Sequence, residues 1–177
     1  GTPTAALVES MQLAIREAHQ LNKPWVLDPI AAGALSWRGQ LAADFLEYKP
    51  TVIRGNASEI IGLAGLGTNA KGFDSSNDAA DSVQAAQSLL DNTDVVSASG
   101  EVDHIVSKTE NAEGTQYWLA KVKGGSYFFP LVTASGCSLG ALVAAYSSVT
   151  TPFNAVVAAH AHYAVAGKKA PLKTDAP

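Results

Sequence analysis

Three short apolar runs, in which polar and apolar residues do not alternate, constrain the fold of this 177-residue chain more than any other feature. They lie at residues 25–27, 51–53 and 94–96, and each has valine at its centre. A strand buried on both faces of a parallel sheet has this pattern, whereas a strand with one face in water alternates. Helical stretches separate the runs, so the sequence predicts an α/β fold with a mainly parallel sheet flanked by helices.

Helices are predicted where apolar residues recur at intervals of three and four. The predicted helices span residues 5–20, 35–46, 56–64, 77–90, 136–148 and 152–167. A glycine-rich loop is expected at 65–76. Further on, segments 102–106 and 115–119 are predicted to form an antiparallel hairpin at the edge of the sheet, joined by a turn at 111–114. Because no internal repeat or linker interrupts the pattern, residues 1–177 are expected to form a single domain.

The composition and charge of the chain argue against nucleic acid and membranes as its binding partners. The net charge is −4 and no basic face is visible, so nucleic acid is not an expected ligand. No apolar run reaches the roughly 18 residues that a membrane span needs. Cys137 is the only cysteine, so no internal disulfide can form, and a cytoplasmic location is the simplest expectation.

The segment 133–137 has the composition of an anion-binding turn that opens a helix. The small residues Ala134, Ser135 and Gly136 allow backbone N–H groups to converge, and the helix that follows directs its positive end to the same place. Such a turn suits a phosphate group. Cys137 falls in the first helical turn, where its thiol could hold or remove a proton from a substrate hydroxyl. The alternative is that this lone cysteine is a small buried hydrophobe.

The segment 53–60 allows two interpretations. Asn56 can cap the helix that follows, and Glu59 is at the capping-box position, which explains both residues structurally. Arg54, however, lies at the carboxyl end of a parallel strand, where open α/β sheets bind ligands, and its guanidinium could clamp phosphate oxygens. Glu59 could then orient a magnesium ion through water. Both interpretations stay open on these residues alone.

Two further polar residues follow predicted strands. Asp28 is either a turn residue before Pro29 or a second acid for a magnesium site. Ser99 could contact a nucleotide phosphate. Because the carboxyl ends of parallel strands meet at one edge of the sheet, these residues, Arg54 and the 133–137 turn are expected to converge on one crevice. His160 and His162 are two residues apart on a helix and are not expected to chelate a metal together.

Taken together, these segments resemble the hydroxyethylthiazole kinase family, the thiamine-salvage branch of the ribokinase-like superfamily. The resemblance rests on residues 24–29, 52–60, 71–75, 99–103 and 132–137, which occur in the family's order. It implies transfer of the γ-phosphoryl group of ATP to the hydroxyl of 4-methyl-5-(2-hydroxyethyl)thiazole. It also implies Mg²⁺ as the cofactor and a homotrimer as the assembly.

The resemblance assigns roles to individual residues. Arg54 and Ser99 would bind ATP, Ala134 would contact the substrate, and Cys137 would be the catalytic residue near its hydroxyl. Ser135 and Gly136 would form the anion-hole turn. Magnesium would lie near Glu59, Asn56 and Asp28, held through water.

The chain also departs from the family pattern. Ala134-Ser135-Gly136 stands where a glycine normally opens the turn, and Ser99 stands in place of a threonine. Relative to the family, the chain is expected to lack an N-terminal portion and the C-terminal end. Two alternatives therefore remain: a ribokinase-like kinase acting on another small alcohol, and a non-catalytic truncated domain that binds nucleotide or assembles with partner chains.

Overall fold

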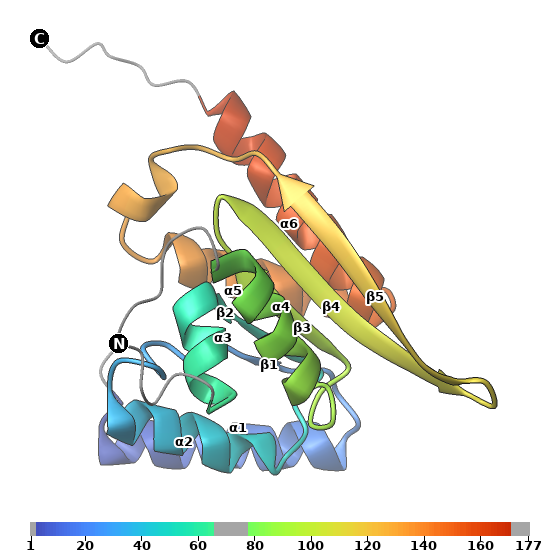
Figure 1. Cartoon of the computed structure of the whole chain (residues 1–177). Helices are drawn as coiled ribbons and strands as arrows, with labels where there is room; N and C mark the ends of the chain where they lie inside the picture. Colours follow the sequence, from blue (N-terminus) through green and yellow to red (C-terminus); the bar gives the residue numbers. More distant parts are fainter. Residues whose placement is uncertain (1–2, 66–77, 171–177) are drawn as a thin grey trace, which may run out of the picture.

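A five-stranded sheet forms the centre of the computed structural model, which describes residues 3–65 and 78–170. Its strands follow one another in chain order: β1 (Val26–Leu27), β2 (Val52–Asn56), β3 (Val95–Ser99), β4 (Val102–Asn111) and β5 (Gly114–Lys123). The first three are parallel, and β4 and β5 add an antiparallel hairpin at the far edge (Figure 1). The expected α/β sheet with an antiparallel edge hairpin is confirmed.

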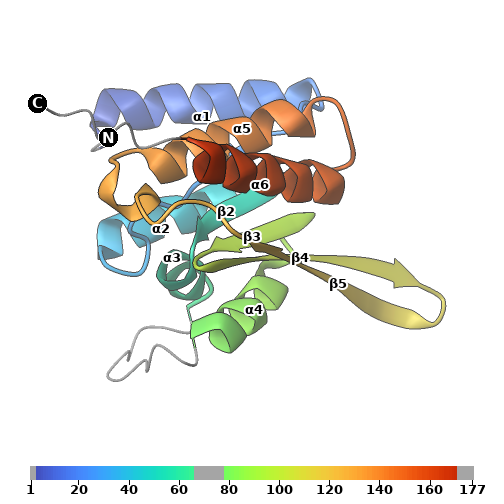
Figure 2. The ribbon, with the colours of Figure 1, turned by 90° about the horizontal axis from the view of Figure 1, so that it is seen from above.

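Six α-helices and one short 3-10 helix surround this sheet in the described part of the chain. They are α1 (Ala5–Gln20), α2 (Ser36–Leu46), α3 (Ala57–Leu63), α4 (Asp78–Leu89), η1 (Phe129–Leu131), α5 (Ser135–Ser147) and α6 (Pro152–Lys169). Helices α5 and α6 cover one face of the sheet and α3 and α4 the other (Figure 2). None of the helices in the described ranges is long and apolar enough to cross a membrane. The predicted loop at 65–76 and the family segment 71–75 lie outside the described residues, apart from Gly65.

Neighbouring residues of each central strand enter opposite halves of the core. Val52 of β2 and Val95 of β3 pack with α5 and α6. The residues that follow them, Ile53 and Val96, pack with α3 and α4 on the other face. Both faces of these strands are therefore buried, which is why the apolar runs show no alternation of polar and apolar residues.

The hairpin is longer than the sequence predicted. Strands β4 and β5 each have ten residues and pair without a bulge from Val102↔Lys123 to Asn111↔Gly114. The outer half of β4 and most of β5 are exposed, so their polar residues give no buried pattern to detect. Gly114 adopts a φ of 123°, a conformation that glycine supplies at the tip of the hairpin.

Candidate functional site

The carboxyl ends of the parallel strands bring three of the predicted residues into contact. Strand β2 continues to Asn56, so Arg54 lies in the middle of the strand and not at its carboxyl end as predicted. Its Nη2 donates to Ser99 Oγ at 2.6 Å, and Ser99 is the last residue of β3. The same guanidinium forms an ion pair through Nη1 with Asp28 Oδ2, 3.2 Å away and directly after β1. Ser99 in turn donates to the carbonyl of Gly55 at 3.2 Å. We call Asp28, Arg54 and Ser99 the strand-end cluster.

The first turns of α5 pack directly against this cluster. A Cβ atom at Gly136 would lie only 2.8 Å from Arg54 Nη1 and 3.3 Å from Nη2. One turn later, a Cβ at Gly140 would lie 3.2 Å from Asp28 Oδ2. Glycine at these two positions therefore lets the helix backbone approach the Arg54–Asp28 pair, and the 133–137 turn joins the crevice as expected.

Two positive groups face each other at this contact. The start of α5 carries the partial positive charge of a helix N-terminus, and Arg54 brings a full charge that is only 7% exposed. Arg54 Nε is buried and has no hydrogen-bond partner among the described residues. Burial raises the pKa of Asp28 above its ordinary 3.8, and this effect outweighs the opposite effect of Arg54. The Asp28 carboxylate, which is the ion-pair partner of Arg54, is therefore itself unfavourable to keep charged. An anion bound at the edge of this contact could reach both the Arg54 guanidinium and the N–H groups that open α5.

The turn that opens α5 is held in a conformation that its sequence does not favour. Ala134 has φ 69° and ψ 7°, in the left-handed region that glycine adopts without cost. Ser135 fixes the turn from both sides: its hydroxyl donates to the Phe129 carbonyl at 2.8 Å, and its own carbonyl accepts from Tyr163 Oη at 2.8 Å. The turn is thus kept in place by its neighbours in spite of the strain at Ala134.

Replacing Ala134 with glycine is expected to stabilise the protein. Glycine removes the left-handed penalty of roughly 1–2 kcal/mol but adds freedom to the unfolded chain, so the net gain should be about 0.5–1 kcal/mol. Urea unfolding of Ala134→Gly beside the parent protein measures it. Ala141→Gly, at an exposed helical position of α5, is the matched control and should lose stability. A loss in both variants would contradict strain at Ala134.

Cys137 is exposed in the first turn of α5. The alternative that it is a small buried hydrophobe is therefore wrong. Its thiol is open to solvent beside the glycine that contacts Arg54, a position from which it can reach a bound molecule.

Glu59 and Asn56 form the capping box of α3. The Asn56 side chain accepts from the Glu59 N–H at 2.9 Å, and Glu59 Oε2 accepts from the Asn56 N–H at 2.8 Å. Glu59 Oε1 also accepts from the N–H of Ala31, 2.9 Å away in the segment that follows β1. Each carboxylate oxygen thus already has a backbone partner. Within residues 3–65 and 78–170, no group of three or more His, Cys, Asp and Glu side chains is arranged to hold a metal directly.

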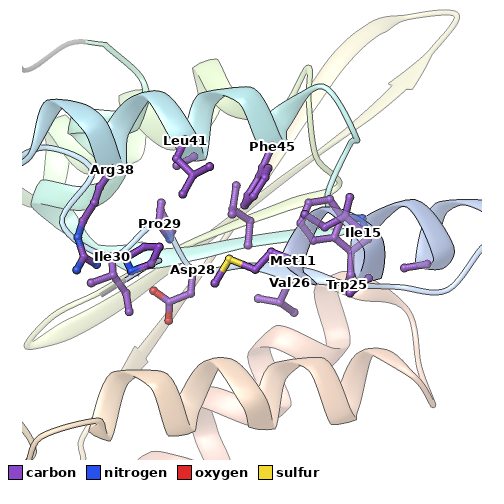
Figure 3. A pocket seen from close by; sticks show the side chains of 15 residues that line it. Met11, Ile15, Trp25, Val26, Asp28, Pro29, Ile30, Arg38, Leu41 and Phe45 are labelled. Atoms are coloured by element: carbon purple, nitrogen blue, oxygen red, sulfur yellow. The ribbon is translucent and has the colours of Figure 1, made fainter. Parts of the chain in front are cut away.

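Sequence reasoning missed a cavity of about 480 Å³ between α1, β1 and α2. Its walls are largely apolar, with Met11 and Ile15 from α1, Trp25 beside β1 and Phe45 from α2 (Figure 3). Asp28 lines it as well and so belongs to both the cavity and the strand-end cluster. The apolar face of α1 predicted that this helix packs on the rest of the fold. The spacing of apolar residues is the same whether they line a cavity or fill a core, so it could not predict the cavity.

Sequence reasoning also left His160 without a partner. In the structure its Nε2 lies 2.7 Å from Ser97 Oγ, and its Nδ1 lies 2.8 Å from Asp103 Oδ2. Asp103 Oδ1 accepts from the N–H of Gly100 at 3.0 Å, in the turn directly after Ser99. We call Ser97, Asp103 and His160 the His160 network. His162 is exposed and bonds Tyr146 instead, so the two histidines face different sides as expected.

Comparison with known sequences gives one consistent family. Residues 1–177 match the model of a family described as "HK: Hydroxyethylthiazole kinase family". Hydroxyethylthiazole kinase of Rhodococcus erythropolis is 48% identical over 178 residues, covering 100% of this chain and 62% of the relative. Its counterpart in Acinetobacter baumannii is 47% identical over 171 residues, covering 96% of this chain and 60% of the relative. The chain therefore spans less than two thirds of the length of these curated relatives.

Solved structures agree with the fold. Hydroxyethylthiazole kinase from Pyrococcus horikoshii superposes with a TM-score of 0.78 at 27% identity, over 96% of this chain and 60% of that one. Pyridoxal kinase from Staphylococcus aureus in complex with AMP-PCP superposes with a TM-score of 0.61 at 20% identity, over 91% and 60% respectively. The second likeness concerns the fold alone. The ribokinase-like fold expected from the sequence is confirmed.

Proposed function

The chain belongs to the hydroxyethylthiazole kinase family, and from this premise we propose that it transfers the γ-phosphoryl group of ATP to the hydroxyl of 4-methyl-5-(2-hydroxyethyl)thiazole. The reaction would serve thiamine biosynthesis and salvage. A cytoplasmic location and a homotrimeric assembly, with no nucleic-acid or membrane partner, are part of the same proposal.

One observation carries this proposal: Arg54 and the N-terminus of α5 present positive charge to the same point. Phosphoryl transfer requires mainly positioning and neutralisation of charge on the transferred group. A guanidinium supplies paired donors that fit phosphate oxygens, and a helix N-terminus supplies backbone N–H groups. In this assignment Arg54 and Ser99 hold the ATP phosphates, and Ser135 and Gly136 cradle the group in transfer.

Cys137 and Ala134 complete the assignment on the substrate side. The exposed thiol of Cys137 would hold or accept the proton of the substrate hydroxyl as the new O–P bond forms. The backbone of Ala134, directly before α5, would contact the substrate. Strong basicity is not needed, because the charge on phosphate is neutralised by other groups.

The residues present fit a magnesium ion held through its own water shell. Mg²⁺ keeps several waters, and Asp28 and Glu59 lie close enough for the charge of Glu59 to raise the pKa of Asp28. Both oxygens of Glu59 accept backbone N–H groups, but each carboxylate oxygen has a further lone pair for a water ligand. Asp28, Glu59 and the neighbouring Asn56 would hold the hydrated ion, which would neutralise phosphate charge.

The function is tested by assaying ATP-dependent phosphorylation in the full-length protein with the thiazole alcohol and, separately, with pyridoxal. We expect turnover of the thiazole. Cys137→Ala should lower kcat by about 100-fold or more, the usual range for loss of proton transfer, with little change in the KM for ATP. Ala141→Ser, at an exposed position one turn further along α5, is the control and should stay active. Turnover of pyridoxal with none of the thiazole would overturn the assignment.

Glu59→Gln separates the structural from the magnesium role of this residue. The amide offers one acceptor oxygen where the carboxylate offers two, so either the Ala31 or the Asn56 N–H loses its partner. We expect a loss of about 1 kcal/mol in the free energy of unfolding, measured in urea. If Glu59 also holds hydrated Mg²⁺, the concentration of Mg²⁺ that gives half-maximal activity should rise in the same variant. Thr4→Ala, which removes the N-cap hydrogen bond of α1, is the control: it should also lose stability but leave that concentration unchanged.

A further inference from the structure

We propose that His160 is a positioning residue that sets the ATP-contacting turn at Ser99 from helix α6. This inference rests on the proposed function, because it gives Ser99 the role of an ATP contact. His160 lies on α6, far from Ser99 in sequence, and is only 1% exposed. Its hydrogen bonds go to Ser97 and Asp103, so its effect on Ser99 would pass through Asp103 and the backbone of the turn.

The His160 ring joins Asp103 on one side and Ser97 on the other. A neutral imidazole that donates from Nδ1–H to Asp103 leaves Nε2 to accept from the Ser97 hydroxyl, and both contacts are satisfied. Asp103 uses its other oxygen to hold the N–H of Gly100 at 3.0 Å. Its carboxylate thereby joins α6 to the backbone immediately after Ser99. Without His160, the Asp103 side chain would no longer be held in this rotamer, and its hydrogen bond to the Gly100 N–H would be weakened.

A second contact from the same face of α6 holds the other wall of the crevice. Tyr163, three residues after His160, donates from its hydroxyl to the carbonyl of Ser135 at 2.8 Å, and its ring stacks on Phe129. Residues three apart on a helix lie on one face. Helix α6 therefore fixes both the Ser99 turn and the start of α5, the two segments between which the phosphates are proposed to bind.

The network resembles a Ser–His–Asp triad in its contacts but not in its access. Ser97 is fully buried within β3, and His160 is nearly so. A nucleophilic serine must reach a substrate carbonyl, and no substrate can reach a hydroxyl enclosed by the sheet and α6. The arrangement is therefore suited to holding the turn and not to hydrolysis.

The test uses His160→Phe, which keeps an aromatic ring at this position and removes both hydrogen bonds. We expect the KM for ATP to rise about fivefold, as for loss of one positioning hydrogen bond, with the KM for the thiazole unchanged. Hydrogen exchange at the Gly100 amide should accelerate by a similar factor. An unchanged KM for ATP together with unchanged exchange at Gly100, in a folded variant, would overturn the proposal. So would an equal rise in both KM values, which indicates general loosening.

Two variants of Asp103 keep the test decisive if His160→Phe does not fold. Asp103→Ala should reproduce the rise in the KM for ATP. Asp103→Asn should restore wild-type behaviour, because its amide can donate to His160 in the other tautomer while its oxygen still accepts from Gly100. His162→Ala, exposed on the same helix, is the control and should change neither readout. Absence of any ATP turnover in the parent protein would overturn the proposed function, while exchange at Gly100 would still decide the positioning role.

Discussion

Replacing Gly136 with valine is expected to slow phosphoryl transfer by about 100-fold. The new Cβ would lie 2.8 Å from Arg54 Nη1, closer than real side-chain contacts allow, and valine adds two methyl groups beyond it. The guanidinium must then move away from Ser99, or α5 must move away from the sheet. Either shift misplaces a phosphate contact by an ångström or so, which typically costs about 100-fold in rate. Steady-state kinetics with ATP and the thiazole alcohol measure this loss.

A graded series makes this expectation specific. Gly136→Ala adds only the Cβ and should lose less activity than Gly136→Val. Ala141→Val places the same valine on an exposed position of α5, where it meets no part of the strand-end cluster, and should remain active. Full activity in Gly136→Val would show that the contact between α5 and Arg54 has no part in the reaction.

Replacing Arg54 with methionine is expected to impair both ATP binding and stability. Hydrogen bonds between charged groups contribute roughly 1.5–3 kcal/mol, so the affinity for ATP should fall by about tenfold to 100-fold. The variant also leaves the carboxylate of Asp28 without its ion-pair partner. Breaking a fully buried ion pair costs roughly 3–5 kcal/mol, and because the Asp28 side chain is 20% exposed we expect a smaller loss of about 2–3 kcal/mol. Calorimetric titration with MgATP and urea unfolding measure the two effects.

The dependence of this stability loss on pH follows from Asp28. Burial raises the pKa of Asp28 above 3.8 even in the presence of Arg54, and without Arg54 it should rise further. A carboxyl whose pKa is raised by folding stabilises the protein below its unfolded pKa, and this contribution is lost as the pH rises through the folded pKa. The stability difference between Arg54→Met and the parent protein should therefore shrink between neutral pH and about pH 4.

A double variant provides the control for the Arg54 prediction. Asp28→Asn combined with Arg54→Met removes both charges, so most of the stability should return while ATP affinity stays low. An affinity for ATP that is unchanged in Arg54→Met would remove Arg54 from the nucleotide site. A stability loss that grows toward acidic pH would contradict the role given to Asp28.

Much of this arrangement was predictable because the core imposes strong patterns. The central valines of β2 and β3 and the residues after them are buried on opposite faces, which leaves non-alternating runs in the sequence. Parallel strands also end at a common edge, so the meeting of Asp28, Arg54 and Ser99 followed from strand positions alone. The capping box of Asn56 and Glu59 followed from local spacing.

Other features depend on tertiary contacts that leave no local pattern. Alanine at 134 predicts ordinary backbone angles, and its left-handed conformation is imposed by the bonds that hold Ser135. His160 and Asp103 are 57 residues apart, and the sequence around a histidine on an apolar helix face does not indicate which distant residue it bonds. The cavity beside β1 is likewise invisible, because the same apolar residues could equally have filled it.

The most direct test of the phosphate site is a crystal structure of the full-length protein with Mg²⁺, AMP-PCP and the thiazole alcohol. We predict that the terminal phosphate contacts both the guanidinium of Arg54 and the backbone N–H groups that open α5, with Ser99 on the phosphate chain and Cys137 facing the substrate hydroxyl. A terminal phosphate bound elsewhere, with Arg54 still engaged only by Asp28 and Ser99, would contradict it.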